Sequence, residues 1–193
     1  TDAVGALRYE PMFVNGAAAK SSRGQRVLGI DPGLTRCGYA VVDGRGGREA
    51  VAVSLGVITT PRTDPLPQRL AALRTEFTAL IAEYRPDVVA VEQVFFQVNV
   101  RTAMSVGQAS GLALAEAALA GCEVFQYSPN QVKDTVAGWS GAGKLQVQKM
   151  VQARLRLSAL PKPADAADAA ALALCHLAMS PLSRRLQPAG APS

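Results

Sequence analysis

The chain has 193 residues, of which 49% are hydrophobic and 18% charged, a composition typical of a globular domain and incompatible with disorder of the whole chain. Lys and Arg number 20 against 15 Asp and Glu, which gives a net charge of +5. If four of the 15 acidic residues share one site, as the motifs below indicate, the remaining surface is strongly basic. An acidic site in a basic surface suits a polyanionic substrate that is attacked with the help of metal ions.

The three cysteines, Cys37, Cys122 and Cys175, are odd in number and form no CxxC motif. This pattern predicts neither a disulfide framework nor a zinc site, and it favours the reducing cytoplasm. The most apolar stretch, residues 103–120, is interrupted by Ser, Gln and Glu, so we expect a helix of a soluble protein and no membrane contact.

The two ends of the chain lack hydrophobic periodicity. Residues 1–24 mix Gly, Ala, Ser and isolated charges, and residues 181–193 are rich in Pro and Arg. We therefore expect a flexible leader over 1–24, a folded domain over 25–180 and a flexible tail over 181–193.

The first apolar run of that domain, residues 26–31, ends abruptly in the carboxylate of Asp31, which a Pro-Gly pair follows. Aliphatic residues predict a buried strand here, and the Pro-Gly pair predicts a turn. Alternating apolar residues over 37–43 and a further run over 50–60 predict two more strands, folded back as a meander. Asp31 is thus placed at a strand end.

A second carboxylate follows a second buried strand. Apolar residues at helical spacing predict a helix over 66–84, and the run over 87–91 predicts a central strand that ends in Glu92. A strand, a crossover helix and another strand favour parallel pairing, so we expect Asp31 and Glu92 at the same edge of the sheet. A Glu in this position is rarely buried unless it is paired or binds a metal ion.

The loop after this strand carries Phe95 and Phe96. We expect one ring to pack inward and the other to be exposed and able to stack on an unpaired base. The next predicted helix, residues 103–120, has a small-xxx-small stretch at Gly107 and Gly111, which lets another helix approach closely. Sequence alone leaves open whether that other helix belongs to this chain or to a second subunit.

A glycine-rich loop follows a predicted strand over 122–127 and a short helix over 128–137. Residues 138–144 fit the first seven positions of the phosphate-binding pattern G-x-x-x-x-G-K-[ST], but Leu145 stands where the pattern needs a hydroxyl. A helix also precedes the loop where the pattern requires a strand. We therefore reject a nucleoside-triphosphatase site.

Basic side chains flank this loop. Lys133 precedes it and Lys144 ends it, and Lys149, Arg154 and Arg156 follow on the next predicted helix. Together they predict a face that contacts phosphate groups. The alternative is an ordinary solvated helix face.

The last predicted helix, residues 164–174, carries Asp165 and Asp168 in its first turn. Residues at i and i+3 lie on one face of a helix, and the surrounding alanines let the helix press against a sheet. Either acid alone is explained by capping or by the helix dipole, but the two together favour ligands at the sheet edge. The single histidine, His176, lies about 16 Å further along the helix and is predicted to be structural.

Four carboxylates, Asp31, Glu92, Asp165 and Asp168, are thus expected at one site. Neither a cysteine nor the histidine offers a nucleophile paired with a base there. Hard oxygen ligands select Mg²⁺, with Mn²⁺ as a substitute, and two such ions activate a water on one side and stabilise the leaving oxygen on the other. The predicted reaction is phosphodiester hydrolysis.

Four motifs over residues 26–179, Gly-Ile-Asp-Pro-Gly, Val-Glu-Gln-Val-Phe-Phe, Gln-Val-Lys and Ala-Asp-Ala-Ala-Asp-Ala, together resemble the RuvC family of Holliday-junction resolvases. The resemblance implies an α/β, ribonuclease-H-like fold with a five-stranded mixed sheet flanked by helices. It implies a homodimer that nicks two opposed strands of a four-way DNA junction in recombination and repair. It also implies the branch-migration proteins RuvA and RuvB as partners.

The resemblance assigns roles to single residues as well. The four carboxylates would bind the metal ions, and Lys133 and Lys144 would contact DNA near the scissile phosphate. Phe95 would be the aromatic residue that disturbs base stacking at the crossover. Residues 1–24 match nothing in the family's pattern.

Three alternatives remain open at this point. A nuclease of the same type could act on structured RNA, and a nonenzymatic protein could bind junctions without cutting them. The stretch Asp-Pro-Gly-Leu-Thr at 31–35 also resembles the D-x-G-x-T phosphate turn of actin- and sugar-kinase-like nucleotide binders. Such binders need a second glycine-rich turn in a second domain, and none follows here, so the acidic pair and the phenylalanine loop favour the resolvase.

Overall fold

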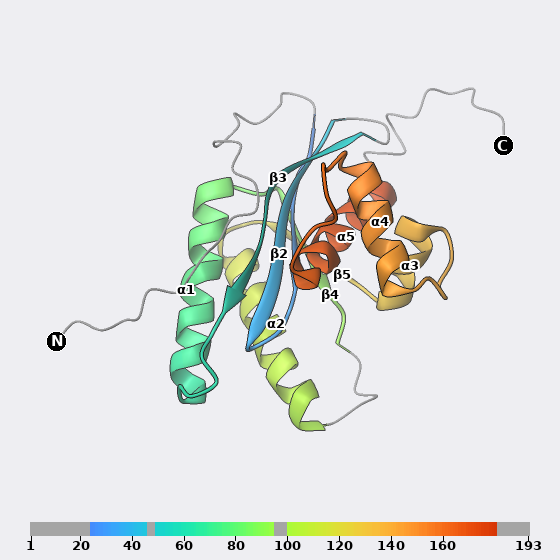
Figure 1. The fold of residues 1–193 in the computed structure, drawn as a ribbon. Coiled ribbons are helices and arrows are strands. Elements are labelled where there is room, and N and C mark those ends of the chain that lie inside the picture. Colours follow the sequence, from blue (N-terminus) through green and yellow to red (C-terminus); the bar gives the residue numbers. More distant parts are fainter. Residues whose placement is uncertain (1–23, 46–48, 95–99, 181–193) are drawn as a thin grey trace, which may run out of the picture.

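A computed structural model of the protein describes residues 24–45, 49–94 and 100–180. Within these ranges the strands are β1 (Arg26–Asp31), β2 (Arg36–Gly44), β3 (Ala50–Thr59), β4 (Val88–Glu92) and β5 (Glu123–Tyr127). The helices are α1 (Leu66–Tyr84), α2 (Val100–Leu119), α3 (Pro129–Ala137), α4 (Lys144–Arg154) and α5 (Ala164–Met179). Figure 1 shows the sheet between two helical layers, with α1 and α2 on one face and α3, α4 and α5 on the other.

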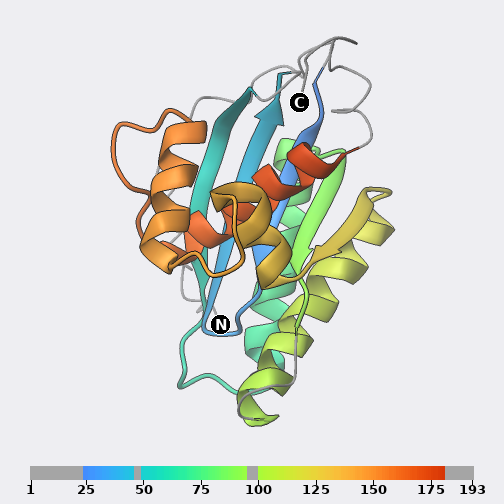
Figure 2. The same ribbon diagram turned by 90° about the vertical axis from the view of Figure 1, so that its right-hand side faces the viewer.

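The strand order in the sheet is β3-β2-β1-β4-β5. β1, β2 and β3 pair antiparallel as a meander, whereas β4 pairs parallel to β1 and β5 parallel to β4. The predicted five-stranded mixed sheet flanked by helices is therefore confirmed. In Figure 2, β1 and β4 run toward the same lower edge of the sheet, which is the edge where the predicted acidic residues belong.

Several helix boundaries differ from the expectation. α2 begins at Val100, three residues before the predicted start, and α5 continues to Met179. α5 runs on because its later residues, including Cys175 and His176, remain buried against the sheet and the layer above it. α4 ends at Arg154, so Arg156 lies beyond the helix on which it was expected.

α5 is the element that carries the two acids of the helical motif, and it lies unusually close to the sheet. A Cβ atom on Gly29 of β1 would overlap the carbonyl oxygen of Ala169, and one on Gly38 of β2 would overlap that of Asp165. Only glycine permits this approach of strand and helix backbones. The alanines of α5 complete the fit, and Figure 2 shows the helix crossing the sheet diagonally.

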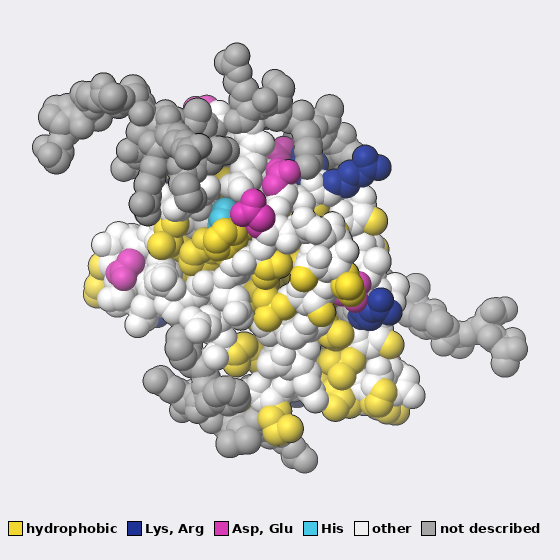
Figure 3. Space-filling model, turned by 180° about the vertical axis from the view of Figure 1, so that it is seen from behind, with side chains coloured by type: hydrophobic (Ala, Val, Ile, Leu, Met, Phe, Trp, Pro, Cys, Tyr) yellow, Lys and Arg dark blue, Asp and Glu magenta, His cyan; other side chains and the backbone are white. Residues whose placement is uncertain are grey.

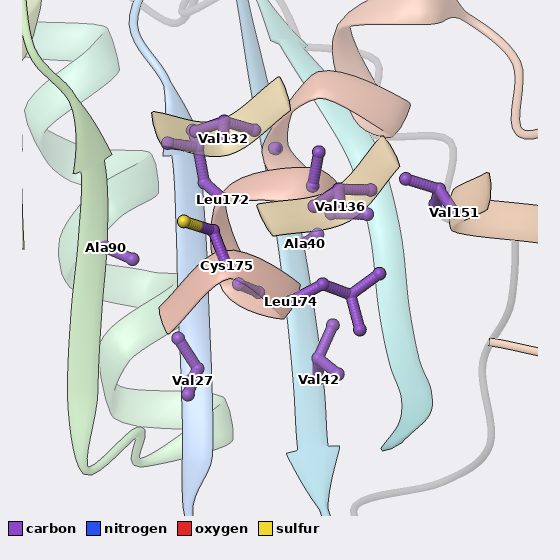
Figure 4. Close-up of a cluster of buried hydrophobic side chains, with 14 of the residues drawn as sticks. Val27, Ala40, Val42, Ala90, Val132, Val136, Val151, Leu172, Leu174 and Cys175 are labelled. Carbon is purple, nitrogen blue, oxygen red and sulfur yellow. The ribbon is translucent and has the colours of Figure 1, made fainter. Parts of the chain in front are cut away.

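The outer side of α5 is covered by α3 and α4. Figure 4 shows Leu172 and Cys175 of α5 between the strands and Val132 and Val136 of α3. α3 begins with a capping box in which Ser128 and Gln131 bond each other's backbone amides, so this short helix is well defined. The packing fixes the first turn of α5 above the strand ends.

A buried ion pair holds the other end of the sheet. The guanidinium of Arg26 donates to both carboxylate oxygens of Asp43, at 2.7 and 2.8 Å, and to the carbonyl oxygen of Tyr84 at 3.0 Å. The backbone amide of Arg26 donates to Asp87 at 2.8 Å. These bonds join the start of β1 to β2 and to the segment before β4, which fixes the register in which β1 and β4 end side by side.

Candidate active site

Two carboxylates stand at the ends of neighbouring parallel strands. Asp31 is the last residue of β1, Glu92 is the last residue of β4, and the pairing of Ile30 with Val91 brings the two side by side. Both side chains are only partly exposed. The sequence-based expectation that the two strand ends share one edge is confirmed.

Two further carboxylates come from α5. Asp165 and Asp168 lie in its first turn, and the contact of Asp165 with Gly38 places that turn over β2, next to β1. Asp31, Asp165 and Asp168 are close enough to interact electrostatically, as are Glu92 and Asp168. The structure therefore brings together all four acidic residues that the sequence singled out.

The environment of these carboxylates opposes their ionisation. Burial, followed by repulsion from Glu92, Asp168 and Asp165, raises the pKa of Asp31 to about 8. Burial and the charge of Asp168 also raise the pKa of Glu92. Buried carboxylates that repel one another are typical of functional sites, where a bound cation offsets the cost.

Two basic side chains pair with this acidic group. Nζ of Lys144 lies 2.7 Å from Oδ2 of Asp168, and this hydrogen bond raises the pKa of Lys144. Arg36 donates from Nε and Nη2 to Oδ2 of Asp165, at 3.0 and 2.8 Å. Lys133 is near enough for its charge to oppose the rise in the pKa of Glu92.

The carboxylates do not yet surround a common point. Over residues 24–45, 49–94 and 100–180, no three His, Cys, Asp or Glu side chains are arranged so that they could hold a metal ion. Asp165 and Asp168 instead direct an oxygen toward Arg36 and Lys144. A metal ion bound by three of these carboxylates together would therefore require some of their side chains to rotate.

The basic face expected around the glycine-rich loop is only partly present. Lys133 and Lys144 lie at the acidic group, but Arg154 donates to the carbonyl oxygen of Thr135 and Arg156 pairs with Glu49. These two arginines therefore do not extend the face toward the site. Their partners are distant in sequence, so periodicity along one helix did not reveal them.

Other sequence expectations have mixed outcomes. Phe95 lies outside the described residues, so its role stays a prediction. His176 is buried in the later part of α5 and bonds Tyr127, as expected of a structural residue. Arg36 was missed, although its place at the start of β2, just after the turn that follows Asp31, was a signal in the sequence.

The cysteines and the hydrophobicity of the helices were also the subject of predictions from the sequence. Cys37, Cys122 and Cys175, all within the described residues, form no disulfide bond, in agreement with the cysteine pattern. Among the described residues, no helix combines the length and the apolar character needed to cross a membrane.

Comparison with known proteins gives consistent matches. A family model described as crossover junction endodeoxyribonuclease RuvC matches residues 27–176. The chain is 55% identical to the RuvC of Salinispora arenicola over 152 residues, which cover 79% of this chain and 87% of that protein. It is 51% identical to the RuvC of Streptomyces avermitilis over 164 residues, covering 85% and 93% of the two chains.

Solved structures agree with these relatives. Thermus thermophilus RuvC in complex with a Holliday junction substrate superposes with a TM-score of 0.75 at 38% identity, covering 79% of this chain and 92% of that one. The yeast mitochondrial resolvase Ydc2 shares the fold, with a TM-score of 0.62 at 16% identity, over 84% of this chain and 80% of that one. The mixed sheet is thus the ribonuclease-H-like sheet of these resolvases. The chain belongs to the RuvC family of crossover junction endodeoxyribonucleases, whose nuclease chemistry depends on divalent metal ions.

Proposed function

We propose that the chain cuts four-way DNA junctions by metal-dependent phosphodiester hydrolysis, in DNA recombination and repair. The observation that carries this proposal is the meeting of four carboxylates at one sheet edge, contributed by β1, β4 and α5. A relative with the same fold has been solved with a Holliday junction as its substrate. The whole chain has a net charge of +5 although four of its acidic residues gather at one site, and this basic excess suits the DNA backbone.

The donor set fits a hard divalent cation. All four groups are carboxylates, which are the ligands that Mg²⁺ and Mn²⁺ prefer. Burial and like charge disfavour the ionised form of Asp31, and a cation among the carboxylates would reverse that effect. All four groups lie at one edge of the sheet, close enough to interact electrostatically, so we expect small side-chain rotations to suffice for metal binding.

We propose that Asp31, Glu92, Asp165 and Asp168 hold two Mg²⁺ ions, which Mn²⁺ can replace. When bound, such a pair supplies an activated water on one side of the phosphate and stabilises the leaving oxygen on the other. The protein's own contribution is to fix the carboxylates on rigid elements, at the ends of two strands and in the first turn of a packed helix.

Lys133 and Lys144 are the proposed contacts to the scissile region of the DNA. The Lys144 side chain is 60% exposed and bonds Asp168 in the structure. Once that carboxylate binds a cation, the ammonium group can contact a phosphate oxygen instead. Lys133 lies on α3, near enough to Glu92 for its charge to act there, so we expect it to contact the same region of the DNA.

We further propose a homodimer formed through α2. A Cβ atom on Gly107 or Gly111 would meet nothing within 4 Å, so no described part of this chain packs there. Met104 and Leu119 on the same helix are 59% and 79% exposed. Figure 3, which shows the molecule from the side of β5 and α2, displays hydrophobic side chains spread over this face. Two opposed nicks require two active sites related by a two-fold axis.

We also propose protein partners and a cellular compartment. RuvA and RuvB are the proposed protein partners, as the family resemblance implies. We propose that the protein acts in the reducing cytoplasm, which suits cysteines that form no disulfide, namely Cys37, Cys122 and Cys175.

A cleavage assay tests the central proposal. End-labelled four-way junction, matching duplex, single-stranded DNA and a structured RNA are incubated with Mg²⁺, Mn²⁺ or EDTA. We expect paired nicks only in the junction and only with metal ions. Glu92→Gln should abolish cutting, whereas Glu83→Gln, which alters an exposed acid in the last turn of α1 at the opposite edge of the sheet, should cut normally. Faster cutting of RNA would favour an RNA substrate, and junction binding without cutting would favour a nonenzymatic binder.

A further inference from the structure

We propose that Arg36 is a positioning residue for Asp165: it holds one carboxylate oxygen so that the other faces the metal ion. This inference rests on the proposed metal site. Arg36 itself touches neither metal nor water in this arrangement, and it acts only through the orientation of Asp165.

β2 contacts Asp165 at two points. Gly38 lies against its backbone, where a Cβ atom on the glycine would overlap the carbonyl oxygen and lie 3.2 Å from the Cβ of Asp165. Arg36 stands two residues earlier on the same face of the strand, because side chains at i and i+2 point the same way. The strand therefore fixes the base of the aspartate side chain through Gly38 and its carboxylate end through Arg36.

The hydrogen bonds leave one oxygen available. Nε and Nη2 of Arg36, at 3.0 and 2.8 Å, both donate to Oδ2 of Asp165. Oδ1 accepts no hydrogen bond from any residue that the structure describes. Because Gly38 holds the base of the side chain, anchoring Oδ2 also sets the plane of the carboxylate and leaves the second oxygen as a ligand position. This distinguishes Arg36 from a cation that merely blocks the site.

The segment that carries Arg36 is itself held. Arg69 of α1 donates to the hydroxyl oxygens of Thr60 and Thr35, at 2.9 and 2.7 Å. The backbone amide of Thr60 donates to the carbonyl oxygen of Thr35 at 3.2 Å. Thr35 is the residue before Arg36, so the turn that leads into β2 is joined to the end of β3 and to α1. A guanidinium can position its partner only if its own backbone does not move.

The alternative is that Arg36 merely competes with the metal ion for the carboxylate of Asp165, and such competition would be weak. The side chains of Arg36 and Asp165 are 47% and 28% exposed, and ion pairs of this exposure contribute little to stability. If Arg36 merely competed with the metal ion for Asp165, removing it would therefore change the metal affinity only slightly. Hydrogen bonds to the far side of a ligand, in contrast, typically change metal affinity by 10- to 100-fold when they are removed.

The test is a Mn²⁺ titration of the full chain without DNA, followed by the loss of the free-ion signal in electron paramagnetic resonance. We expect Arg36→Gln to weaken Mn²⁺ binding by about 10- to 100-fold. Arg36→Lys keeps the charge but has only a single donor group, so it should bind at an intermediate level. In an Asp165→Asn background, Arg36→Gln should cause no further loss.

Two controls separate positioning from other effects. Arg156→Gln breaks another exposed Arg-carboxylate pair, with Glu49, and should leave Mn²⁺ affinity unchanged. Arg36→Lys keeps the charge, so it should bind the junction in EDTA as tightly as the wild type, because the residue is not proposed to contact DNA. Equal or tighter Mn²⁺ binding by Arg36→Gln would overturn the inference, and so would full retention of Mn²⁺ affinity by Arg36→Lys or a loss of junction affinity in EDTA by Arg36→Lys.

The titration also distinguishes this inference from the proposed metal site. If the wild type binds no Mn²⁺, or if Asp165→Asn binds as well as the wild type, the proposed site fails and the inference fails with it. If Asp165→Asn loses binding but Arg36→Gln does not, the site stands and only the role of Arg36 is refuted.

Discussion

Acidification from pH 7 to pH 5 should destabilise the protein by about 2 kcal/mol through His176 alone. Burial lowers the pKa of His176 from 6.5 to about 4. Nδ1 lies 2.8 Å from the Tyr127 hydroxyl and Nε2 lies 3.2 Å from Oε1 of Gln25. A neutral ring satisfies both contacts, since it accepts from Tyr127 and donates to Gln25. The ring of Phe125, 4.7 Å from the imidazole between centroids, offers no counter-charge.

Stability decreases as the pH falls because the unfolded chain binds a proton at His176 more readily than the folded protein does. Below pH 6.5 the unfolded chain protonates its histidine, whereas the folded protein does so only near pH 4. The contribution of neutral His176 is therefore fully present above pH 6.5 and declines as the pH falls toward 4. Each pH unit between 6.5 and about 4 changes the free energy of unfolding by about 1.4 kcal/mol. Between pH 7 and pH 6.5 the unfolded histidine is still mostly neutral, so the total change from pH 7 to pH 5 is about 2 kcal/mol.

Urea denaturation at a series of pH values, in EDTA, measures this effect. Asp31 and other groups titrate over the same range, so the informative quantity is the difference between wild type and His176→Gln. Gln does not titrate, and the difference between the two unfolding free energies should shrink by about 2 kcal/mol between pH 7 and pH 5. Parallel curves for the two proteins would refute a buried neutral histidine.

Asp31→Asn should abolish cleavage and leave junction binding intact, and a variant that still cuts would remove Asp31 from the ligand set. The same change should raise the melting temperature in EDTA, because a neutral group replaces a buried carboxylate that its neighbours repel. Lys133→Ala should lower the slope of log affinity against log salt by about one, measured by junction binding, whereas an unchanged slope and rate would exclude a phosphate contact. Gly111→Leu should yield monomers in sedimentation that cannot nick both strands of one junction, and a fully active dimer would place the subunit contact elsewhere. Gly29→Ala should cost about 1–3 kcal/mol of unfolding free energy, because the new methyl group meets the backbone of α5 at Ala169, and an unchanged melting temperature would contradict that contact.

Much of the active site was predictable from local sequence because its carboxylates stand at the ends of two strands and in the first turn of one helix. The apolar runs before Asp31 and Glu92 defined two buried strands, and the helix between them required a parallel pair. Asp165 and Asp168 share a helix face by their spacing alone. In each case the period of one element, or the handedness of one connection, is sufficient to place the carboxylate.

The partners of these carboxylates depended on the tertiary structure. Arg36 and Asp165 are 129 residues apart, and Lys144 reaches Asp168 from a different helix. No periodicity relates such residues, since their contact arises only when α5 settles on β2 at Gly38. Tyr127 of β5 and His176 of α5, 49 residues apart, likewise meet only because α5 lies across the sheet.

The face that α2 leaves open was also decided by packing. A small-xxx-small stretch permits a close helix neighbour but does not say which chain supplies it. In the structure, α2 buries Ala109, Ala113 and Ala117 in the core on this face of the sheet, and a Cβ atom on Gly107 or Gly111 would meet nothing within 4 Å. Local sequence therefore determined which groups end at the catalytic edge. Tertiary packing determined how those groups pair and which face remains for a partner, because pairing and exposure depend on residues that are close in space but distant along the chain.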